Sequence, residues 1–252
     1  MAMAADIQTV GILGGGVMGS GIGQVLAQAG FRVLIRDLNQ ELLERCRNTI
    51  VEGRFGLKRA VERGRISQEQ MEQALANLSF TTRVEDLAGV ELLIEAVPES
   101  LDLKKQVFAE LDRLVQPGVI FASNTSGFPI SELNKAVSEA RRPRFIGMHW
   151  FSPVAVMKLV ELVYAPETAE ETIAALEGVC QRADKVSIRV KDAPGTYGFV
   201  ANRIYFAAVR EAQRVLQEGI ASAEDIDKAM VYGFNWPVGP LSMGRGARAG
   251  WQ

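Results

Sequence analysis

The feature that most constrains the fold is a glycine-rich loop between a short apolar run and an apolar-periodic helix near the start of the chain. Residues 9–13 form the apolar run, and Gly14, Gly16 and Gly19 follow it in the spacing GxGxxG. The spacing alone is weak, because a chain with 24 glycines produces it by chance. Between a strand and a helix, however, it is typical of a loop that binds a dinucleotide.

Each glycine of this loop has a mechanical role in such a site. Gly14 permits the tight turn, Gly16 lets the backbone approach a pyrophosphate, and Gly19 lets the helix pack closely on the sheet. The helix that begins at Val17 and Met18 directs its N-terminal amide groups at the phosphates. We therefore predict that these five residues bind the cofactor.

The end of the next predicted strand bears on which dinucleotide is bound. Asp37 follows the apolar run 32–36 and is placed to accept hydrogen bonds from the adenosine ribose. Its carboxylate also repels the extra phosphate of NADP, whereas the neighbouring Arg36 favours that phosphate. We expect NAD rather than NADP; a glycine turn without any ligand is the alternative.

Strand-length apolar runs alternate with segments of helical period up to about residue 190. The predicted strands cover residues 9–13, 32–36, 92–97, 119–122, 145–150 and 157–163. This alternation predicts an α/β fold, a Rossmann-type and mostly parallel sheet covered by helices, over residues 1–190. A long polar helical stretch, residues 40–78, is broken at several glycines and restarts with a capping box at Ser67, which predicts an inserted helical hairpin.

The strand pattern stops beyond residue 190. Residues 191–198 have the glycine and proline content of a linker, and helices are predicted at 199–217 and 223–232, the second opened by Ser222. We expect a smaller all-α domain over residues 191–252. Its last residues, 244–252, are glycine-rich and basic and are predicted to be poorly ordered.

The composition argues against several other classes of protein. A net charge of −2 is unfavourable for binding nucleic acid, which needs a broad positive surface. The two cysteines, Cys46 and Cys180, form no pattern of a disulfide framework or a metal site. No apolar run has the length of a membrane span, and the first residues lack a signal-peptide pattern, so we expect a cytoplasmic protein without membrane or metal.

Several motifs in a fixed order resemble the L-3-hydroxyacyl-CoA dehydrogenases. Besides the glycine loop they are EAVPE at 95–99, NTS at 124–126, GMHWFSP at 147–153, MKLVE at 157–161, FVANR at 199–203 and PVGPL at 237–241. The resemblance runs from Val10 to about Met243. It implies an oxidoreductase of fatty-acid metabolism and β-oxidation that converts (S)-3-hydroxyacyl-CoA to 3-oxoacyl-CoA with NAD, as a homodimer joined through the C-terminal helices.

Oxidation of a secondary alcohol needs a base for the hydroxyl proton, and the chain has one histidine, His149. His149 lies at the end of a predicted strand, the edge where ligands bind in open α/β sheets. If the next strand returns antiparallel around Ala155, Glu161 falls opposite His149, within about 5 Å between Cβ atoms. The alternatives are a structural histidine and a solvent-facing glutamate. The resemblance implies that His149 is the general base and Glu161 its partner.

The resemblance also assigns residues around the reacting oxygen and the nicotinamide. Ser126 is similar to a serine that hydrogen-bonds the reacting oxygen and contacts the cofactor, and Asn202 to an asparagine that positions the same region from the second domain. Glu99 and Lys104 resemble residues on the nicotinamide-ribose side. If the resemblance is set aside, the simplest interpretations are that Ser126 caps a helix, that Asn202 is a polar residue at the start of a helix and that Lys104 is a solvated helix lysine.

Residues 45–65 carry seven basic side chains against two acidic ones. A solvated helix face is the default explanation. The resemblance implies instead that this arm receives the phosphates of coenzyme A, and Lys58 is our candidate for that contact.

The chain departs from the family pattern at three places. Ser152 stands where the family usually has asparagine, which alters one contact to the cofactor or the histidine. Three extra residues, 196–198, precede the FVANR motif and make the placement of Asn202 less certain. The chain also stops soon after Met243, where the family continues into helices that complete the substrate domain and the dimer contact.

Two further functions therefore stay open. One is a dehydrogenase of a 3-hydroxy acid that carries no CoA, and the other is an NAD-binding protein with impaired catalysis. The sequence specifies neither the acyl chain length, the pathway nor the oligomeric state.

Overall fold

The computed structural model describes residues 7–195 and 197–243, and the chain divides into two compact units after residue 196. The last strand of the first unit, β8 (Val186–Lys191), continues through the predicted boundary at residue 190, so the linker begins after it. Thr196, the first of the three extra linker residues, and the tail 244–252 lie outside the described residues.

The first unit is built on a sheet in the order β3-β2-β1-β4-β5-β6-β7-β8. Every neighbouring pair is parallel except β6 and β7, so the predicted mostly parallel sheet is confirmed. Its strands are β1 (Thr9–Leu13), β2 (Arg32–Arg36), β3 (Leu78–Thr81), β4 (Leu92–Glu95), β5 (Ile120–Ser123), β6 (Phe145–Trp150), β7 (Leu159–Tyr164) and β8. The sequence predicted neither β3 nor β8 as a strand.

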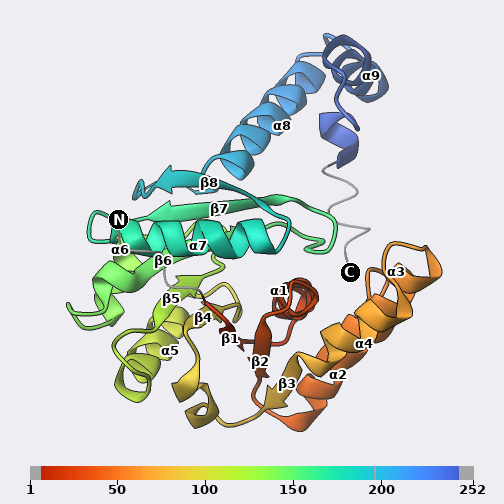
Figure 1. Ribbon diagram of the computed structural model, residues 1–252. Coiled ribbons are helices and arrows are strands. Elements are labelled where there is room, and N and C mark those ends of the chain that lie inside the picture. The colour runs from red at the N-terminus through yellow and green to blue at the C-terminus, as the bar shows by residue number, and fades with distance from the viewer. Residues whose placement is uncertain (1–6, 196, 244–252) are drawn as a thin grey trace. The chain divides into compact units, whose positions relative to one another are not determined.

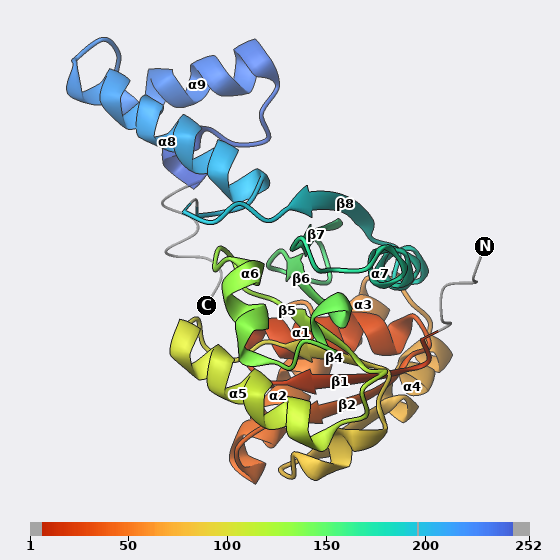
Figure 2. The ribbon, with the colours of Figure 1, turned by 90° about the vertical axis from the view of Figure 1, so that its left-hand side faces the viewer.

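Helices cover both faces of this sheet, as Figures 1 and 2 show for α1 and α5 on opposite sides of β1 and β4. On one face of the sheet, side chains such as Ile12 of β1 and Ile94 of β4 belong to one hydrophobic core with residues of α1, α2, α4 and α7. The opposite face of β5 and β6 packs Phe121 and Phe145 against Phe108 of α5. The helices are α1 (Val17–Gln28), α2 (Gln40–Glu52), α3 (Leu57–Glu62), α4 (Gln68–Ala76), α5 (Leu101–Leu114), α6 (Ile130–Leu133) and α7 (Glu170–Arg182).

The segment α2–α4 projects from the sheet and corresponds to the predicted inserted hairpin (Figure 1). Its breaks fall at the predicted glycines, Gly53 and Gly56 between α2 and α3 and Gly64 between α3 and α4. The predicted capping box is present at the start of α4: the Ser67 side chain accepts a hydrogen bond from the Gln70 amide, and the Gln70 side chain accepts one from the Ser67 amide.

The second unit contains α8 (Ala201–Gln217) and α9 (Ala223–Phe234). Ser222 caps α9 by accepting a hydrogen bond from the Asp225 amide, as its position predicts. Among the described helices of the whole chain, none combines the length and the apolar character that crossing a membrane requires.

Candidate active site

The register of the sheet brings the predicted site residues to one edge. Leu13, Glu95, Ser123 and Gly147 are neighbours across β1, β4, β5 and β6. The glycine loop and the motifs EAVPE and NTS follow directly after the first three strands, and His149 lies two residues beyond Gly147. This carboxyl edge, the edge at which the parallel strands end, is where open α/β sheets bind their ligands.

The glycine loop leaves room for a ligand at one of its three motif glycines and packs tightly at the other two. Gly14 has φ +92°, and a Cβ at Gly19 would lie 1.7 Å from the carbonyl oxygen of Gly14. A Cβ at Gly16, in contrast, meets no atom within 4 Å among the described residues. Gly16 also caps α1 without a side-chain hydrogen bond, so the first amides of the helix suit an anion.

Asp37 is bound to the glycine loop itself, a contact that the sequence did not predict. Its Oδ2 accepts a hydrogen bond from the Gly15 amide at 2.7 Å, and its Oδ1 accepts one from Leu38 at 2.7 Å. The carboxylate is therefore fixed beside the loop before a ribose adds its own hydrogen bonds. Open space at Gly16, helix amides and a fixed carboxylate together fit a dinucleotide.

The predicted pairing of His149 with Glu161 is confirmed. The two residues are direct partners in the antiparallel register of β6 and β7. The Nδ1 of His149 lies 2.7 Å from Oε2 of Glu161, and the two residues are 4% and 0% exposed. A buried carboxylate at Nδ1 fixes the ring orientation and directs Nε2 away from it, which is the arrangement of a general base.

Asn124 supports the end of β6, although the sequence assigned it no role. Its Oδ1 accepts a hydrogen bond at 2.9 Å from the Trp150 amide, next to the histidine. The ring of Phe151 lies 4.5 Å from the His149 ring, centre to centre. The NTS motif was the signal, since a polar triplet directly after a buried strand lies at the carboxyl edge.

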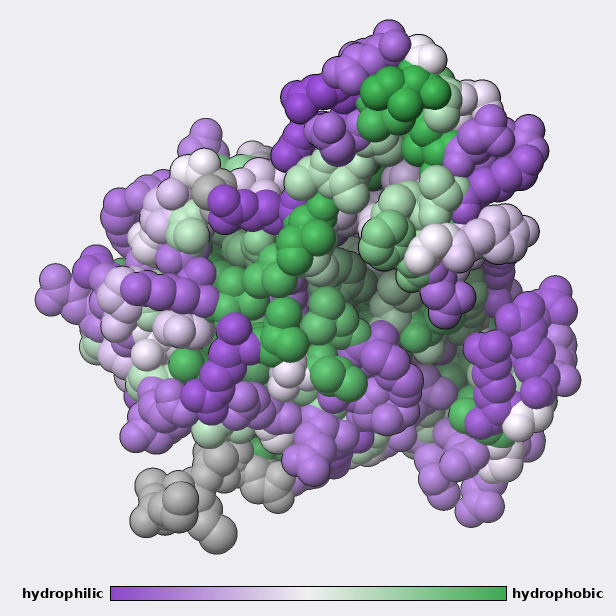
Figure 3. Space-filling view, turned by 90° about the horizontal axis from the view of Figure 1, so that it is seen from above, coloured by the Kyte–Doolittle hydropathy of each residue, from purple (hydrophilic) through white to green (hydrophobic). Residues whose placement is uncertain are grey.

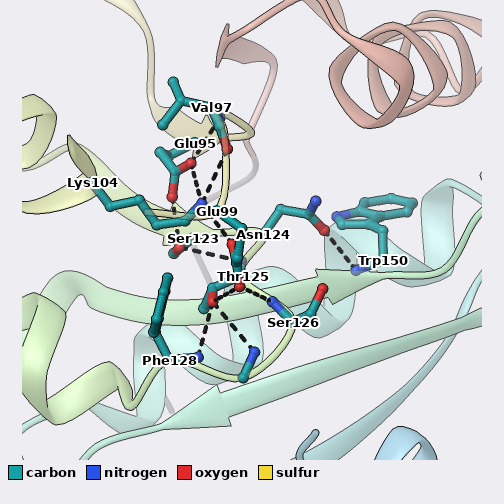
Figure 4. Close-up of polar contacts among 11 residues, drawn as sticks. Glu95, Val97, Glu99, Lys104, Ser123, Asn124, Thr125, Ser126, Phe128 and Trp150 are labelled. Carbon is teal, nitrogen blue, oxygen red and sulfur yellow. Dashed lines mark hydrogen bonds and ion pairs between the residues drawn. The ribbon is translucent and has the colours of Figure 1, made fainter. Parts of the chain in front are cut away.

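Lys104, predicted on the nicotinamide side, is buried in a polar network under this edge (Figure 4). Its ammonium lies 2.6 Å from Oε1 of Glu95 and 3.2 Å from Oε2 of Glu99, and it donates to the carbonyl of Val97 at 3.3 Å. Glu95 Oε2 accepts a hydrogen bond from Ser123. Burial raises the pKa of the Glu95 carboxyl, and the ammonium of Lys104 opposes that rise.

Glu99 links this network to Ser126. Its Oε1 accepts hydrogen bonds from the Thr125 hydroxyl at 2.6 Å and from the Ser126 amide at 2.9 Å. Thr125 in turn accepts hydrogen bonds from the amides of Gly127 and Phe128. The backbone around Ser126 is therefore fixed by side chains, while Figure 4 shows its hydroxyl outside the network.

The loop between β6 and β7 is held by Lys185, which the sequence did not single out. The buried ammonium donates to the carbonyls of Val154 at 2.6 Å and Met157 at 2.8 Å. Burial lowers the pKa of Lys185 to about 8. Val154 packs against α1 at Gly21, while Ser152, at the start of the loop, is exposed.

A basic cleft of about 310 Å³ lies between the inserted hairpin, α1 and the β6–β7 loop. Lys58, the predicted phosphate contact, is not among its lining residues. It is half-exposed and pairs with Glu52, because its neighbour Leu57 takes the buried position at the start of α3. The cationic side chains that line the cleft are Arg54, Arg59, Arg63 and Arg65.

Asn202 belongs to the second unit, where it lies in the first turn of α8. The preceding Phe199 has a positive φ of 43° at the end of the linker.

Two family models match the chain. Residues 9–193 match the model described as "3-hydroxyacyl-CoA dehydrogenase, NAD binding domain", and residues 198–249 match "3-hydroxyacyl-CoA dehydrogenase, C-terminal domain".

Relatives of known sequence and structure agree with these matches. The chain is 40% identical to the 3-hydroxybutyryl-CoA dehydrogenase of Mycobacterium tuberculosis over 243 residues, 96% of this chain and 82% of the relative. The crystal structure of (S)-3-hydroxybutyryl-CoA dehydrogenase from Ralstonia eutropha is similar with a TM-score of 0.88 and 40% identity, covering 94% of this chain and 81% of that one. A structure titled as a diketoreductase acting on dicarbonyl compounds has a TM-score of 0.86 and 29% identity, covering 95% and 83%.

Proposed function

The chain belongs to the 3-hydroxyacyl-CoA dehydrogenase family, and on that basis we propose that it oxidises (S)-3-hydroxyacyl-CoA to 3-oxoacyl-CoA with NAD. The observation that carries this proposal is the buried His149–Glu161 pair at the same sheet edge as the glycine loop. A histidine with a fixed ring is the base that the reaction needs.

His149 takes the hydroxyl proton of the substrate. Since Glu161 accepts a hydrogen bond from Nδ1, the neutral ring carries its own proton there and has its lone pair on Nε2. When Nε2 receives the proton, the negative charge of Glu161 stabilises the imidazolium that forms. The hydroxyl oxygen keeps the electron pair of the O–H bond and forms the carbonyl as the hydrogen on C3 leaves as hydride.

The residues of the glycine loop hold the cofactor. NAD, when bound, supplies the acceptor for that hydride. Gly16, with the helix start at Val17 and Met18, receives the pyrophosphate, while Gly14 and Gly19 allow the turn and the close helix packing beside it. Asp37 binds the adenosine ribose, and its negative charge favours NAD over NADP.

Residues near the reacting oxygen complete the proposal. Ser126 offers its hydroxyl to the oxygen of the substrate, since its backbone is fixed from behind by Glu99. Asn202 contributes from the second unit. Glu99 and the exposed Ser152 face the nicotinamide side.

We propose that the four arginines of the basic cleft receive the phosphates of coenzyme A. Guanidinium groups match phosphate oxygens in a bidentate manner, and among the described residues that line the cleft Asp184 is the only acidic one. In this proposal, arginines of the same hairpin take the phosphate contact that the sequence analysis assigned to Lys58.

A thioester that lacks phosphates tests the cleft. The double variant Arg63→Ala/Arg65→Ala is expected to raise the KM for 3-hydroxybutyryl-CoA by about 10-fold or more, and Lys58→Ala to leave it unchanged. For the N-acetylcysteamine thioester of the same acyl group, neither variant is expected to change KM. An equal rise for both thioesters would contradict a phosphate contact.

The function itself is tested by a substrate panel that follows NADH formation. We expect turnover with (S)-3-hydroxybutyryl-CoA or a longer (S)-3-hydroxyacyl-CoA, none with the (R) isomers, and a preference for NAD over NADP. Absence of turnover with every 3-hydroxyacyl-CoA in the panel would refute the proposal.

A second candidate is a dehydrogenase of a hydroxy acid that carries no CoA. The similarity to the diketoreductase structure, at 29% identity, favours including this candidate. Turnover of free 3-hydroxy acids together with inactivity on their CoA thioesters would select it.

For its assembly we propose a homodimer joined through α8 and α9. Only Ala212 of α8 is buried, and green hydrophobic side chains stand on the surface of the helical unit in Figure 3. The exposed large hydrophobic side chains of this unit include Ile204, Phe206, Leu216 and Ile220. Sedimentation at several concentrations checks this proposal, and a monomer at all of them would contradict it. We propose the cytoplasm as the location, in keeping with the free thiols of both cysteines.

A further inference from the structure

The loop between β6 and β7, residues 151–158, lies beside both ends of the proposed substrate site. Phe151, at the start of the loop, has its ring 4.5 Å from the His149 ring, centre to centre. Ala155, in the middle of the loop, lines the basic cleft. With the acyl group of a CoA thioester at the base and its phosphates at the arginines, the course of this loop sets how the two ends are placed relative to one another.

The loop contains a tight turn that packs on α1. The amides of Val156 and Met157 both donate to the carbonyl of Pro153 at 2.9 Å. Val154 is 3% exposed, and a Cβ at Gly21 of α1 would lie 3.0 Å from the Cβ of Val154, so the two elements are in close contact. The carbonyl of the buried Val154 needs a donor from outside the turn, because burial of an unpaired carbonyl is costly.

Lys185 supplies that donor from the junction of α7 and β8. Its ammonium donates to the carbonyls of Val154 at 2.6 Å and Met157 at 2.8 Å. It lies 5.9 Å from the centre of the Trp150 ring, and the residue is 9% exposed. Burial of an ammonium is unfavourable unless its hydrogen bonds are made. A methionine of similar length would fill the same space without that cost, so what the ammonium contributes is its two bonds to the loop.

We propose that Lys185 is a positioning residue, which holds the β6–β7 loop as a wall of the basic cleft so that a CoA thioester reaches the catalytic base and the arginines at the same time. Lys185 acts through the two loop carbonyls that it binds. The inference rests on the proposed function for what the two ends of the site receive, whereas the anchoring of the loop stands on the contacts alone.

The test variant is Lys185→Met, which keeps the length of the side chain and removes both donors. The matched control is Lys135→Met, which removes an exposed lysine of the same unit that pairs with Glu132. If Lys185→Met does not fold, Lys185→Ala/Val154→Ala replaces it, since this variant removes the donors and also relieves the packing of the loop on α1. The expected outcomes are the same for both loop variants.

The first readout is amide hydrogen exchange of Val156 and Met157, which needs no turnover. Relative to the amides of β1 in the same protein, we expect exchange at these two positions to be about 10-fold faster or more in Lys185→Met and unchanged in Lys135→Met. The reference to β1 removes any general loss of stability. Unchanged relative exchange in Lys185→Met would overturn the inference, even if the protein oxidises no acyl-CoA.

The second readout separates KM from kcat with two thioesters of the same acyl group. We expect Lys185→Met to raise the KM for (S)-3-hydroxybutyryl-CoA about 10-fold and to leave the KM for its N-acetylcysteamine thioester unchanged, because the short thioester does not reach the cleft. The value of kcat should stay within about threefold for both. A merely structural role would instead reduce the amount of active protein, which lowers the apparent kcat equally for both thioesters and leaves each KM unchanged.

A double-mutant cycle with the arginines completes the test. If the loop acts through the cleft, Lys185→Met adds little to the KM for the CoA thioester in the Arg63→Ala/Arg65→Ala background. Fully additive effects, or an equal rise of KM for both thioesters, would overturn the inference while leaving the dehydrogenase function intact. Absence of wild-type turnover would refute the proposed function instead, and the exchange readout then decides the inference.

Discussion

At the scale of single residues, the site depends on buried polar groups whose partners lie on other elements. His149 meets Glu161 across two strands, Asp37 meets the Gly15 amide across a loop, and Asn124 meets the Trp150 amide. The contacts fix the His149 ring, the carboxylate of Asp37 and the end of β6, which all lie at the proposed site. Substitutions at these contacts should therefore separate catalysis from folding.

Replacing Glu161 by glutamine keeps the shape of the side chain and removes its charge. The carbonyl oxygen of the neutral glutamine amide still accepts a hydrogen bond from Nδ1 of His149. It stabilises an imidazolium much less than a carboxylate does, so we expect kcat to fall on the order of 10²-fold to 10⁴-fold. NADH affinity, measured by fluorescence, should stay unchanged, and the exposed Glu171→Gln serves as the control. A kcat within a factor of two of the control would contradict the role of Glu161.

Substitutions at two glycines of the loop are predicted to have different effects, one on NADH binding and the other on thermal stability. Gly16 has φ −66° and ψ −165° and open space around it, so Gly16→Ala should keep the thermal stability and weaken NADH binding by about 10-fold or more. Gly19→Ala places a Cβ against the Gly14 carbonyl and should lower the melting temperature. Calorimetry and NADH titration check both. Unaltered NADH binding in Gly16→Ala would show that no pyrophosphate approaches there.

At the scale of elements, the sequence predicted those parts of the fold that have a local signal. The spans of β1, β2 and β6 were predicted to the residue because each is a short, dense run of apolar residues. β3 was missed because its first residue continues the helical period of α4, and β8 because as an edge strand it keeps charged Arg189 on an exposed face.

The candidate site divides in the same way. The His149–Glu161 pair followed from strand pairing, which has a fixed period. The sequence could not predict that Lys104 is buried or that Lys185 binds the β6–β7 loop. A lysine in a helix or just after one is expected to be solvated unless its tertiary partners are known. In our proposal the phosphate contact moves from Lys58 to four arginines of the hairpin. Three of them, Arg54, Arg63 and Arg65, lie in the connections before and after α3, whose course has no simple sequence signal.

Lys185 predicts a pH dependence of stability. The pKa of this lysine is about 8 in the fold, against 10.5 for its ordinary value, with burial as the main cause and Lys158 adding to it. Between these two values the unfolded chain binds a proton that the folded protein does not, so the free energy of unfolding rises with pH. The neutral amine still has two N–H groups for the two carbonyls that it binds.

Urea unfolding of the protein and of Lys185→Met checks this sign. The stability of the protein relative to the variant should increase from about pH 7.5 to about pH 9.5. Taking the difference removes the contributions of the other titrating groups. A difference that falls or stays constant over this range would contradict the burial of the ammonium.

At the scale of the whole molecule, our proposal places the cofactor loop, the base and the basic cleft in the first unit, while the second contains Asn202 and an apolar helical surface. This distribution assigns hydride and proton chemistry to one unit. Assembly belongs to the other in our proposal.

The two cysteines report on the integrity of the first unit. Cys46 and Cys180 are buried, and burial raises the pKa of each thiol to about 12. Because the thiolate is the reactive form, Ellman's reagent should label neither thiol in the native protein near pH 8 and both after denaturation. Rapid labelling of one thiol in the native state would show that its helix opens or packs differently.

The most direct test of the central claim is the rate of NADH formation from (S)-3-hydroxybutyryl-CoA by the protein and by His149→Gln, with NADH affinity measured on both. The account predicts turnover by the protein, a loss on the order of 10²-fold to 10⁴-fold in the variant, and equal NADH affinity. Near-normal turnover by His149→Gln would contradict it.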